Sequence, residues 1–286
     1  MSARAILLPL AALLVLLLLL APAACVRTST SGASPPPVEP ASLRVVTWNI
    51  HHGRGLDDVV DVARLARQLE ALRPDVVFLQ EVDVGVRRSG GVDIPTELAQ
   101  RLGMHAAFGK NIDYQGGDYG NAILSRLPLR GVDNLHYRML REGEQRGVLQ
   151  AEVQVGARPL RLWNTHIDWR PDDAERLQNV AELRDLLRAP AGGDAPVVLA
   201  GDFNDLPDSA VHALLCEDFV DAFLAVAAGD ERSGDGYSFP ADAPRKRIDW
   251  VLTSDAERVA PRAARVMPTV ASDHAPVVVD FDLRQY

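Results

Sequence analysis

Short runs of apolar residues that end in polar clusters recur along the chain. The stretch PVVLAGDFND at 196–205 begins with apolar residues and ends in oxygen-rich side chains. A short apolar run bounded by turn residues is typical of a buried strand. The same pattern predicts further strands at 43–49, 75–81, 122–125, 247–252, 260–267 and 275–281, and a hairpin of 146–155 with 158–165.

Between these strands, apolar positions at helical spacing predict the helices. They lie at 57–72, 95–102, 171–188 and 209–215. The glycine-rich stretches 111–121 and 229–236 are expected to be loops. Strands that alternate with helices predict an α/β fold. The runs 75–81 and 196–202 share one design, with Glu81 and Asp202 each five residues after the first valine, which suggests two similar halves.

The N-terminal residues have a different composition from the rest. Residues 1–24 carry one charge, Arg4, before a leucine-rich apolar stretch, as in a secretory signal peptide. Cys25 follows small residues, as at a bacterial lipoprotein processing site, so three outcomes stay open: a lipidated Cys25, a cleaved soluble protein, or an uncleaved anchor. Residues 25–42 form a Ser/Pro-rich linker, and 43–286 form the domain. All three outcomes place the domain outside the cytoplasm, as a periplasmic, membrane-anchored or secreted protein.

The net charge and the cysteine count limit which partners and which cross-links the chain is expected to have. The chain has 286 residues with ordinary globular composition and a formal net charge of −9, which favours one large domain without a general basic surface for nucleic acid. A local basic patch stays open. Basic contacts near the site can come from Arg54, Arg87, Arg88 and Lys110, which can equally be solvated surface charges. The two cysteines, Cys25 and Cys216, predict no disulfide framework, and Cys216 is expected to be a core thiol.

The polar clusters contain the side chains that a metal-dependent hydrolase needs. Glu81, Asp273 and Asn49 offer the hard oxygen ligands that bind magnesium or manganese. Asp249 can orient His274, because a carboxylate fixes the tautomer of an imidazole. Such a set, with further polar groups around an anion, suits metal-assisted hydrolysis of a phosphoester. The other polar groups are Asp202, Asn204 and His166.

Each of these residues also has a structural alternative. Asn49 can be a turn residue, Glu81 a surface ion pair, and Asp273 with His274 a cap. His166 can be a hydrogen-bonded structural histidine. Asp249 fits such an alternative least, because it lies between Ile248 and Trp250 and is costly to bury without a partner.

The motifs TWNIHHG, LQEVD, GNAILS, NTHID, GDFND, RIDWVL and SDHAPV, in this order over 47–277, resemble the endonuclease/exonuclease/phosphatase superfamily. The resemblance implies a DNase I-like four-layer α/β sandwich, with two packed mixed β-sheets flanked by helices. It implies that Glu81 is the principal metal ligand, supported by Asn49 and Asp273.

The resemblance also implies the catalytic roles. His274, oriented by Asp249, contacts the phosphate; Asp202 positions and deprotonates the attacking water; Asn204 holds the phosphoryl group or that water. His166 stands where related enzymes have a phosphate-contacting histidine.

Three functions remain open from the sequence. The first is a magnesium- or manganese-dependent phosphodiesterase or phosphatase, monomeric, that acts on a lipid headgroup or small phosphoester at the envelope. The second is a secreted nuclease. The third is a non-catalytic envelope binding protein of the same fold.

Overall fold

The computed structural model describes residues 41–156, 158–189, 193–226 and 234–284, which belong to one compact unit, Glu39–Tyr286. The predicted signal peptide, Cys25 and the linker up to residue 40 lie outside the described residues. No helix among the described residues is long and apolar enough to cross a membrane.

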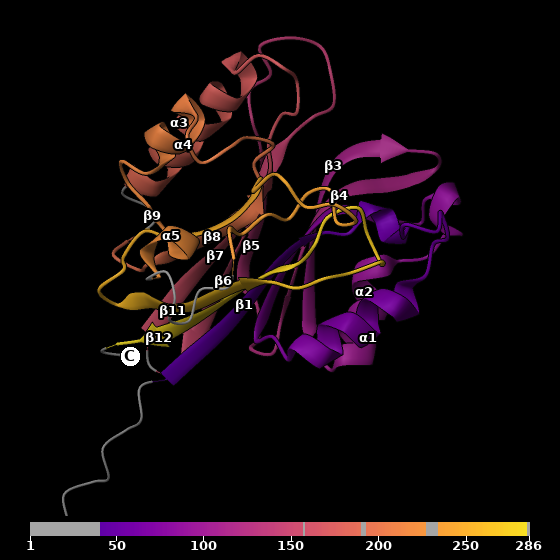
Figure 1. The fold of residues 1–286 in the computed structure, drawn as a ribbon, viewed down its shortest axis with the longest axis horizontal. Helices are drawn as coiled ribbons and strands as arrows, with labels where there is room; N and C mark the ends of the chain where they lie inside the picture. The colour runs from indigo at the N-terminus through magenta and orange to yellow at the C-terminus, as the bar shows by residue number, and fades with distance from the viewer. Residues whose placement is uncertain (1–40, 157, 190–192, 227–233, 285–286) are drawn as a thin grey trace, which may run out of the picture. The chain divides into compact units, whose positions relative to one another are not determined.

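Two six-stranded sheets contain all the strands of the described residues (Figure 1). The first sheet has the order β11 (Val259–Val266), β12 (Val277–Leu283), β1 (Ala41–Asn49), β2 (Val76–Val84), β4 (Gly117–Ser125) and β3 (His105–Tyr114). The second has the order β5 (Arg130–His136), β6 (Gly147–Val155), β7 (Arg158–His166), β8 (Val197–Asp202), β10 (Asp249–Thr253) and β9 (Val220–Asp221).

The two sheets have the same internal pattern. Each has one parallel pair near its middle, β1 with β2 and β7 with β8. All other neighbouring strands are antiparallel. This agreement supports the two similar halves that the sequence suggested.

The apolar residues of the sheets fall into three clusters, because alternate residues of a strand face opposite sides. In β2, Val76 and Phe78 face the other sheet, and Val77 and Leu79 face the helices α1 (Val62–Leu72) and α2 (Ile94–Leu102). A third cluster lies between the second sheet and the helices α3 (Ala174–Arg188) and α4 (Ala210–Leu215). The layers are therefore helices, sheet, sheet and helices, which confirms the predicted four-layer α/β sandwich. A short fifth helix, α5 (Ala222–Ala225), packs against β10 and β11.

Capping residues set where several of the helices begin and end. Asp61 and Ser209 accept hydrogen bonds from backbone N–H groups of the first turns of α1 and α4. Gly103 ends α2 in the left-handed conformation. The predicted helix 57–72 therefore begins only at Val62, after its cap.

The two loops predicted from glycine-rich sequence have different outcomes in the structure. The predicted loop 111–121 is wrong: β3 and β4 form a hairpin there, and its turn lies at 115–116. A Cβ atom on Gly120 would lie 1.9 Å from the Gly109 carbonyl oxygen, so this glycine allows two strands to approach closely. Of the predicted loop 229–236, residues 229–233 lie outside the described residues.

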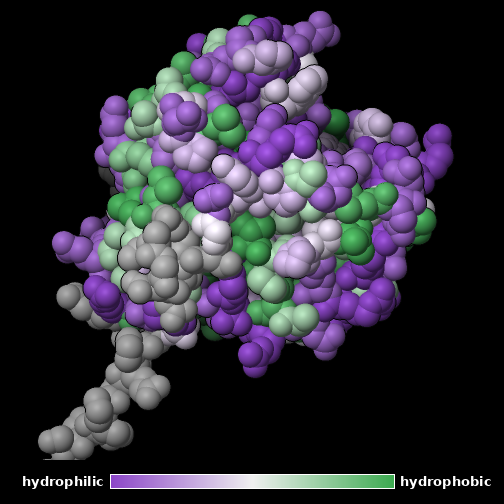
Figure 2. Space-filling view, viewed as in Figure 1, coloured by the Kyte–Doolittle hydropathy of each residue, from purple (hydrophilic) through white to green (hydrophobic). Residues whose placement is uncertain are grey.

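Figure 2 shows one face of the protein, viewed as in Figure 1. Hydrophilic residues predominate on this face, and the hydrophobic ones form small separate groups. On the part of this face that the described residues form, the hydrophobic side chains are therefore not gathered into one continuous patch.

Candidate active site

The site lies where the parallel strands of both sheets end. Asn49 is the last residue of β1 and pairs with Gln80 of β2. In the second sheet, His166 ends β7 and pairs with Asp202, which ends β8. The antiparallel strand β10 begins beside them, since Asp249 pairs with Asp202. The strand register therefore brings together polar residues that are far apart in sequence.

A glycine allows this register. Gly201 has a φ of 158°, and a Cβ atom there would lie 1.9 Å from the Thr165 carbonyl oxygen. A larger residue at this position would push β8 away from β7, and with it Asp202 away from His166.

Glu81 is turned toward the site by an irregularity in β2. The pairing of β2 with β4 shifts between Leu79 and Val82, and Glu81 has a φ of 58°. Bulges re-aim side chains next to active sites, and left-handed non-glycine residues mark backbone strain that the surrounding structure must stabilise. The Asn49 Nδ2 atom then donates to Glu81 Oε1 and to Asp202 Oδ2, both at 3.0 Å. One amide therefore links a carboxylate of each sheet.

His274 is held by a buried carboxylate, as predicted from the sequence. Its Nδ1 lies 2.9 Å from Asp249 Oδ2, which also accepts a hydrogen bond from Ser238 Oγ at 2.5 Å. The Trp48 indole N–H donates to the His274 carbonyl oxygen at 2.7 Å. Burial alone would lower the pKa of His274, but the carboxylates of Asp249 and Asp202 outweigh it and raise the pKa to about 10. The ring is therefore an imidazolium at neutral pH.

Asp202 lies opposite this imidazolium. Its Oδ2 is 3.7 Å from His274 Nε2, and its Oδ1 accepts a hydrogen bond from the Asn204 backbone N–H at 2.9 Å. Burial raises the pKa of Asp202, and the negative charge of Asp249 raises it further. A carboxylate with a raised pKa is a better base.

The Asn204 side-chain amide already uses one of its N–H groups in a hydrogen bond within the protein. Its Nδ2 donates to the Ile167 carbonyl oxygen at 3.1 Å, and its backbone is left-handed, with a φ of 49°. One N–H of the amide remains for a ligand, which keeps the predicted donor role chemically open.

His166 is a neutral donor that faces Asp202. Its Nδ1 lies 2.9 Å from Arg146 Nη1. A guanidinium can only donate, so Nδ1 is the acceptor and the proton is on Nε2. That Nε2 lies 3.5 Å from Asp202 Oδ2. Burial lowers the pKa of His166 well below its usual value, and the charges of Arg146 and His274 add to this.

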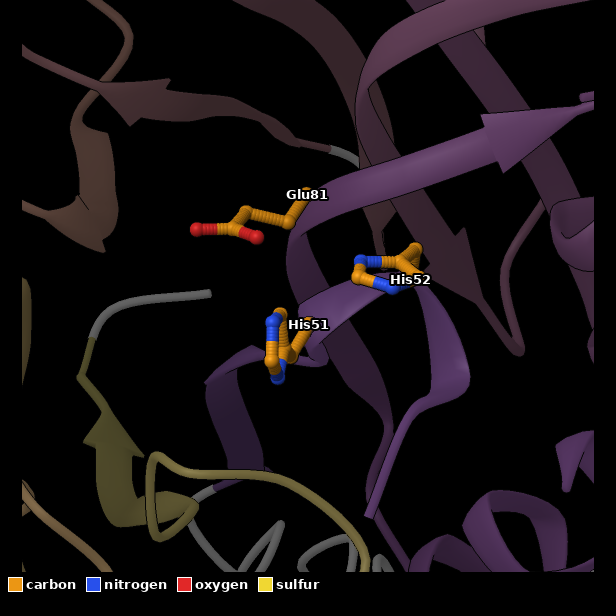
Figure 3. Close-up of side chains that lie close together, drawn as sticks. All are labelled: His51, His52 and Glu81. Carbon is orange, nitrogen blue, oxygen red and sulfur yellow. The ribbon is translucent and has the colours of Figure 1, made fainter. Parts of the chain in front are cut away.

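Asp273 lies at the edge of the site. Its side chain is 39% exposed, and its Oδ1 lies 3.6 Å from His51 Nδ1. His51, His52 and Glu81 lie close together, with one ligand atom of each within 4.8 Å of the others (Figure 3). The structure thus connects Glu81 to Asp273 through His51, whereas Asn49 reaches Glu81 directly.

These residues fit a divalent cation. Glu81 and Asp273 are partly exposed carboxylates without a lysine or arginine partner among the described residues, and carboxylate oxygens with adjacent imidazoles are ordinary metal ligands. As placed, however, Asn49 directs its NH₂ group and not its oxygen toward Glu81, and its oxygen accepts the His51 N–H. Asn49 therefore orients the carboxylates here.

Sequence reasoning missed several contributors, among them His51, which lies between Glu81 and Asp273. Arg146 fixes the tautomer of His166, Ser238 supports Asp249, and His52 lies beside Glu81. Only the HHG motif gave a signal for His52. The expectation that Cys216 is a core thiol is wrong, because this residue is exposed.

Two packed mixed sheets between helices, with an acid–imidazole site at the strand ends, define a DNase I-like α/β sandwich. Residues 46–274 match the model of the Endonuclease/Exonuclease/phosphatase family, and the chain belongs to this family. Members of this family are hydrolases that act on phosphoesters.

Several known proteins are similar to this chain in sequence or in fold. The uncharacterized protein YbhP of Escherichia coli K12 is 28% identical over 255 residues, which covers 85% of this chain and 97% of the relative. An endonuclease/exonuclease/phosphatase of Beutenbergia cavernae is 25% identical with a TM-score of 0.68, over 85% of this chain and 72% of that one. The mannosyl-6-phosphatase of Bacteroides thetaiotaomicron has the same fold at 16% identity, with a TM-score of 0.69 over 84% of this chain and 99% of that one.

Proposed function

We propose that this protein is a divalent-metal-dependent phosphoester hydrolase of the cell envelope, which acts on a lipid headgroup or a small phosphoester. One observation carries the proposal most: the His274 imidazolium lies between Asp249 and Asp202, and burial raises the pKa of Asp202. Such an arrangement provides a positive charge for phosphoryl oxygens and a base for water at one point.

The residues divide the chemistry as follows. His274 donates its Nε2–H to a phosphoryl oxygen, and Asp249 keeps the ring charged and oriented. Asp202 accepts the proton of the attacking water, because burial raises its proton affinity. His166 contributes an Nε2–H to the same space, and Asn204 a remaining amide N–H. Asn49 holds Glu81 and Asp202 in place.

Glu81 would hold the cation, with Asp273 beside it. When bound, a cation such as magnesium or manganese supplies Lewis-acid stabilisation of the phosphoryl oxygens. The chain itself contributes the orientation of these carboxylates and the proton-transfer groups.

The preference for a small substrate rests on charge. Three of the four basic residues that could supply contacts near the site are engaged with carboxylates: Arg54 with Asp58, Arg88 with Asp83, and Lys110 with Asp113 and Asp118. Together with the net charge of −9, this disfavours a long polyanion. The location at the envelope rests on the sequence of residues 1–42, and a lipidated Cys25 would tether the domain to the membrane. We infer a monomer.

Hydrolysis of bis-p-nitrophenyl phosphate and p-nitrophenyl phosphate, with magnesium or manganese, tests the proposal. We expect activity that is lost in excess chelator and in His274→Ala. His105→Ala is the matched control, because His105 is exposed on β3. Activity that persists in chelator or in His274→Ala would refute the mechanism, and no activity on any ester would favour a binding protein. Plasmid nicking without release of phospholipid headgroups would instead identify a nuclease.

A further inference from the structure

Two consecutive histidines beside Glu81 have an unusual backbone. His51 and His52 have φ values of 44° and 46°, and Glu81 has a φ of 58°. Left-handed conformations are unfavourable for side chains of this kind, and such strain clusters at functional sites. In Figure 3 the Glu81 carboxylate and the two imidazole rings point toward a common space. The three strained residues therefore converge on one point.

His52 has a buried nitrogen without a hydrogen-bond partner among the described residues. This atom is Nδ1, and the residue as a whole is only 7% exposed. Buried polar atoms are nearly always hydrogen-bonded, so an orphaned one requires an explanation. An imidazole nitrogen that lacks a protein partner is suited to bind a ligand that the polypeptide does not supply.

Two guanidinium groups, those of Arg88 and Arg54, act on His52 from nearby, and each is paired with a carboxylate. Arg54 lies 2.7 Å from Asp58, and the Arg88 guanidinium forms two hydrogen bonds of 2.9 Å with Asp83. Glu81 forms no ion pair within the described part of the chain. Its negative charge therefore remains uncompensated beside the two rings.

We propose that His51, His52 and Glu81 bind a divalent transition-metal ion, of the zinc or cobalt kind. Two imidazole nitrogens and one carboxylate oxygen suit such ions, whereas magnesium prefers oxygen ligands alone. Three protein ligands also leave positions for water or substrate. The inference deepens the proposed function because Glu81 is the ligand that both share, but metal binding does not require hydrolysis.

The distances allow the three ligands to meet at one ion. One ligand atom of each residue lies within 4.8 Å of the others, and His51 Nδ1 lies 3.6 Å from Asp273 Oδ1. An ion bound at about 2.0–2.1 Å by each nitrogen holds its ligand atoms closer to one another than 4.8 Å, so the three side chains must move together when the ion binds. His51 and Glu81 are only half-buried, so their side chains can rotate toward the fixed ring of His52.

Cobalt(II) absorption and calorimetric zinc titration test the proposal on the metal-free, untagged protein. His51→Asn and His52→Asn remove the imidazoles, and asparagine tolerates the left-handed backbone better than most residues. We expect each variant to bind zinc about 10–100-fold more weakly and to change the cobalt spectrum, since losing even a supporting group costs this much. Magnesium affinity should change less. His105→Asn should bind both ions like the wild type.

Equal zinc affinity and an unchanged cobalt spectrum in both variants would overturn the proposal. Thermal unfolding in chelator shows whether each variant folds. If His52→Asn does not, His52→Gly accepts the same backbone, and His51→Asn tests the site independently. An inactive protein whose cobalt spectrum depends on His51 and His52 would refute the proposed hydrolase and retain this site. An active hydrolase whose cobalt spectrum does not depend on His51 and His52 would retain the proposed function and refute this metal site.

Discussion

Asp202 and His274 meet across the two sheets, with Asp202 Oδ2 3.7 Å from His274 Nε2. Asp202 ends a strand of the second sheet, and His274 lies just before β12 of the first. Both are buried, at 1% and 5% exposure. The contact exists only when the sheets are packed, so the site depends on the sandwich as a whole.

Replacing Asp249 by asparagine should leave His274 in place but remove its compensating charge. We expect kcat to fall about 100-fold or more, as for the loss of a well-placed acid–base partner. The carboxylate of Asp249 helps to raise the pKa of His274 to about 10, so its loss lowers that pKa. The fall of activity at high pH, where the ring loses its proton, should therefore begin at lower pH. Rate profiles from acid to alkaline pH measure both effects.

The control for this variant is Asp255→Asn, which removes a carboxylate away from the site. Among the described residues, the Asp255 side chain accepts hydrogen bonds from its own turn, from Glu257 and Arg258. An Asp249→Asn variant with wild-type kcat and an unchanged alkaline limb would contradict the role of this carboxylate.

Asn49→Asp should make the site dependent on a cation. The Asn49 amide donates to Glu81 and Asp202 at 3.0 Å, and an aspartate would replace this donor by a third negative group. We expect the free energy of unfolding in chelator to fall by about 1–3 kcal/mol, the cost of unsatisfied buried groups. A divalent cation should restore part of the loss. Urea unfolding with and without manganese measures this.

As a control, Gln100→Glu adds the same charge on the exposed face of α2. It should change neither the free energy of unfolding in chelator nor the effect of manganese on it. If Asn49→Asp were as stable as the wild type in chelator, the amide would not be needed to hold the two carboxylates together.

The strands that bear the site were predictable because each has a local signature. The apolar runs that end in Asn49, Glu81 and Asp202 are also the centres of the two sheets. β3 and β5 left no such signature. The glycine-rich stretch 111–121, which includes Gly120 of β4, resembles a loop in sequence and concealed the end of β3, and β5 is an exposed strand at the sheet edge.

The site was predictable as a set of residues, and much less as a set of contacts. Asp249 was noticeable because a carboxylate inside an apolar strand needs a partner. The support of Asp249 by Ser238 and of His166 by Arg146 depends on packing between distant segments. No spacing along the chain encodes these pairs, so the tautomer of His166 follows only from the structure.

A buried asparagine joins the two sheets, and its removal should be costly. Asn164 Nδ2 donates to the carbonyl oxygens of Leu79 and Ala122 at 2.8 Å, and its Oδ1 accepts from Gln80 at 2.7 Å. Asn164→Ala leaves these groups without this partner. Since each unsatisfied buried group costs about 1–3 kcal/mol, we expect a loss of at least this size in urea unfolding. Gln154→Ala, in the preceding strand, should have a small effect, and equal losses would refute this role.

His212 should make stability depend on pH outside the active site. Its Nε2 lies 2.9 Å from Asp221 Oδ2, which also accepts from Arg247. Burial alone would lower the pKa of His212, but the bonds to Asp221 and Cys216 outweigh it and raise the pKa from 6.5 to about 9. The folded state therefore binds this proton more tightly than the unfolded state. Its contribution to stability is complete below pH 6.5 and is lost as the pH rises through about 9.

Urea unfolding over this pH range should show a decline in the wild type that is smaller in His212→Gln. Because the Cys216 thiol lies 3.6 Å from the same nitrogen, both proteins should carry Cys216→Ser, so that this contact is removed from the comparison. His105→Gln replaces an exposed histidine and should keep the decline of the wild type. If His212→Gln declined as steeply as that control, the proton of His212 would not be the source of the pH dependence.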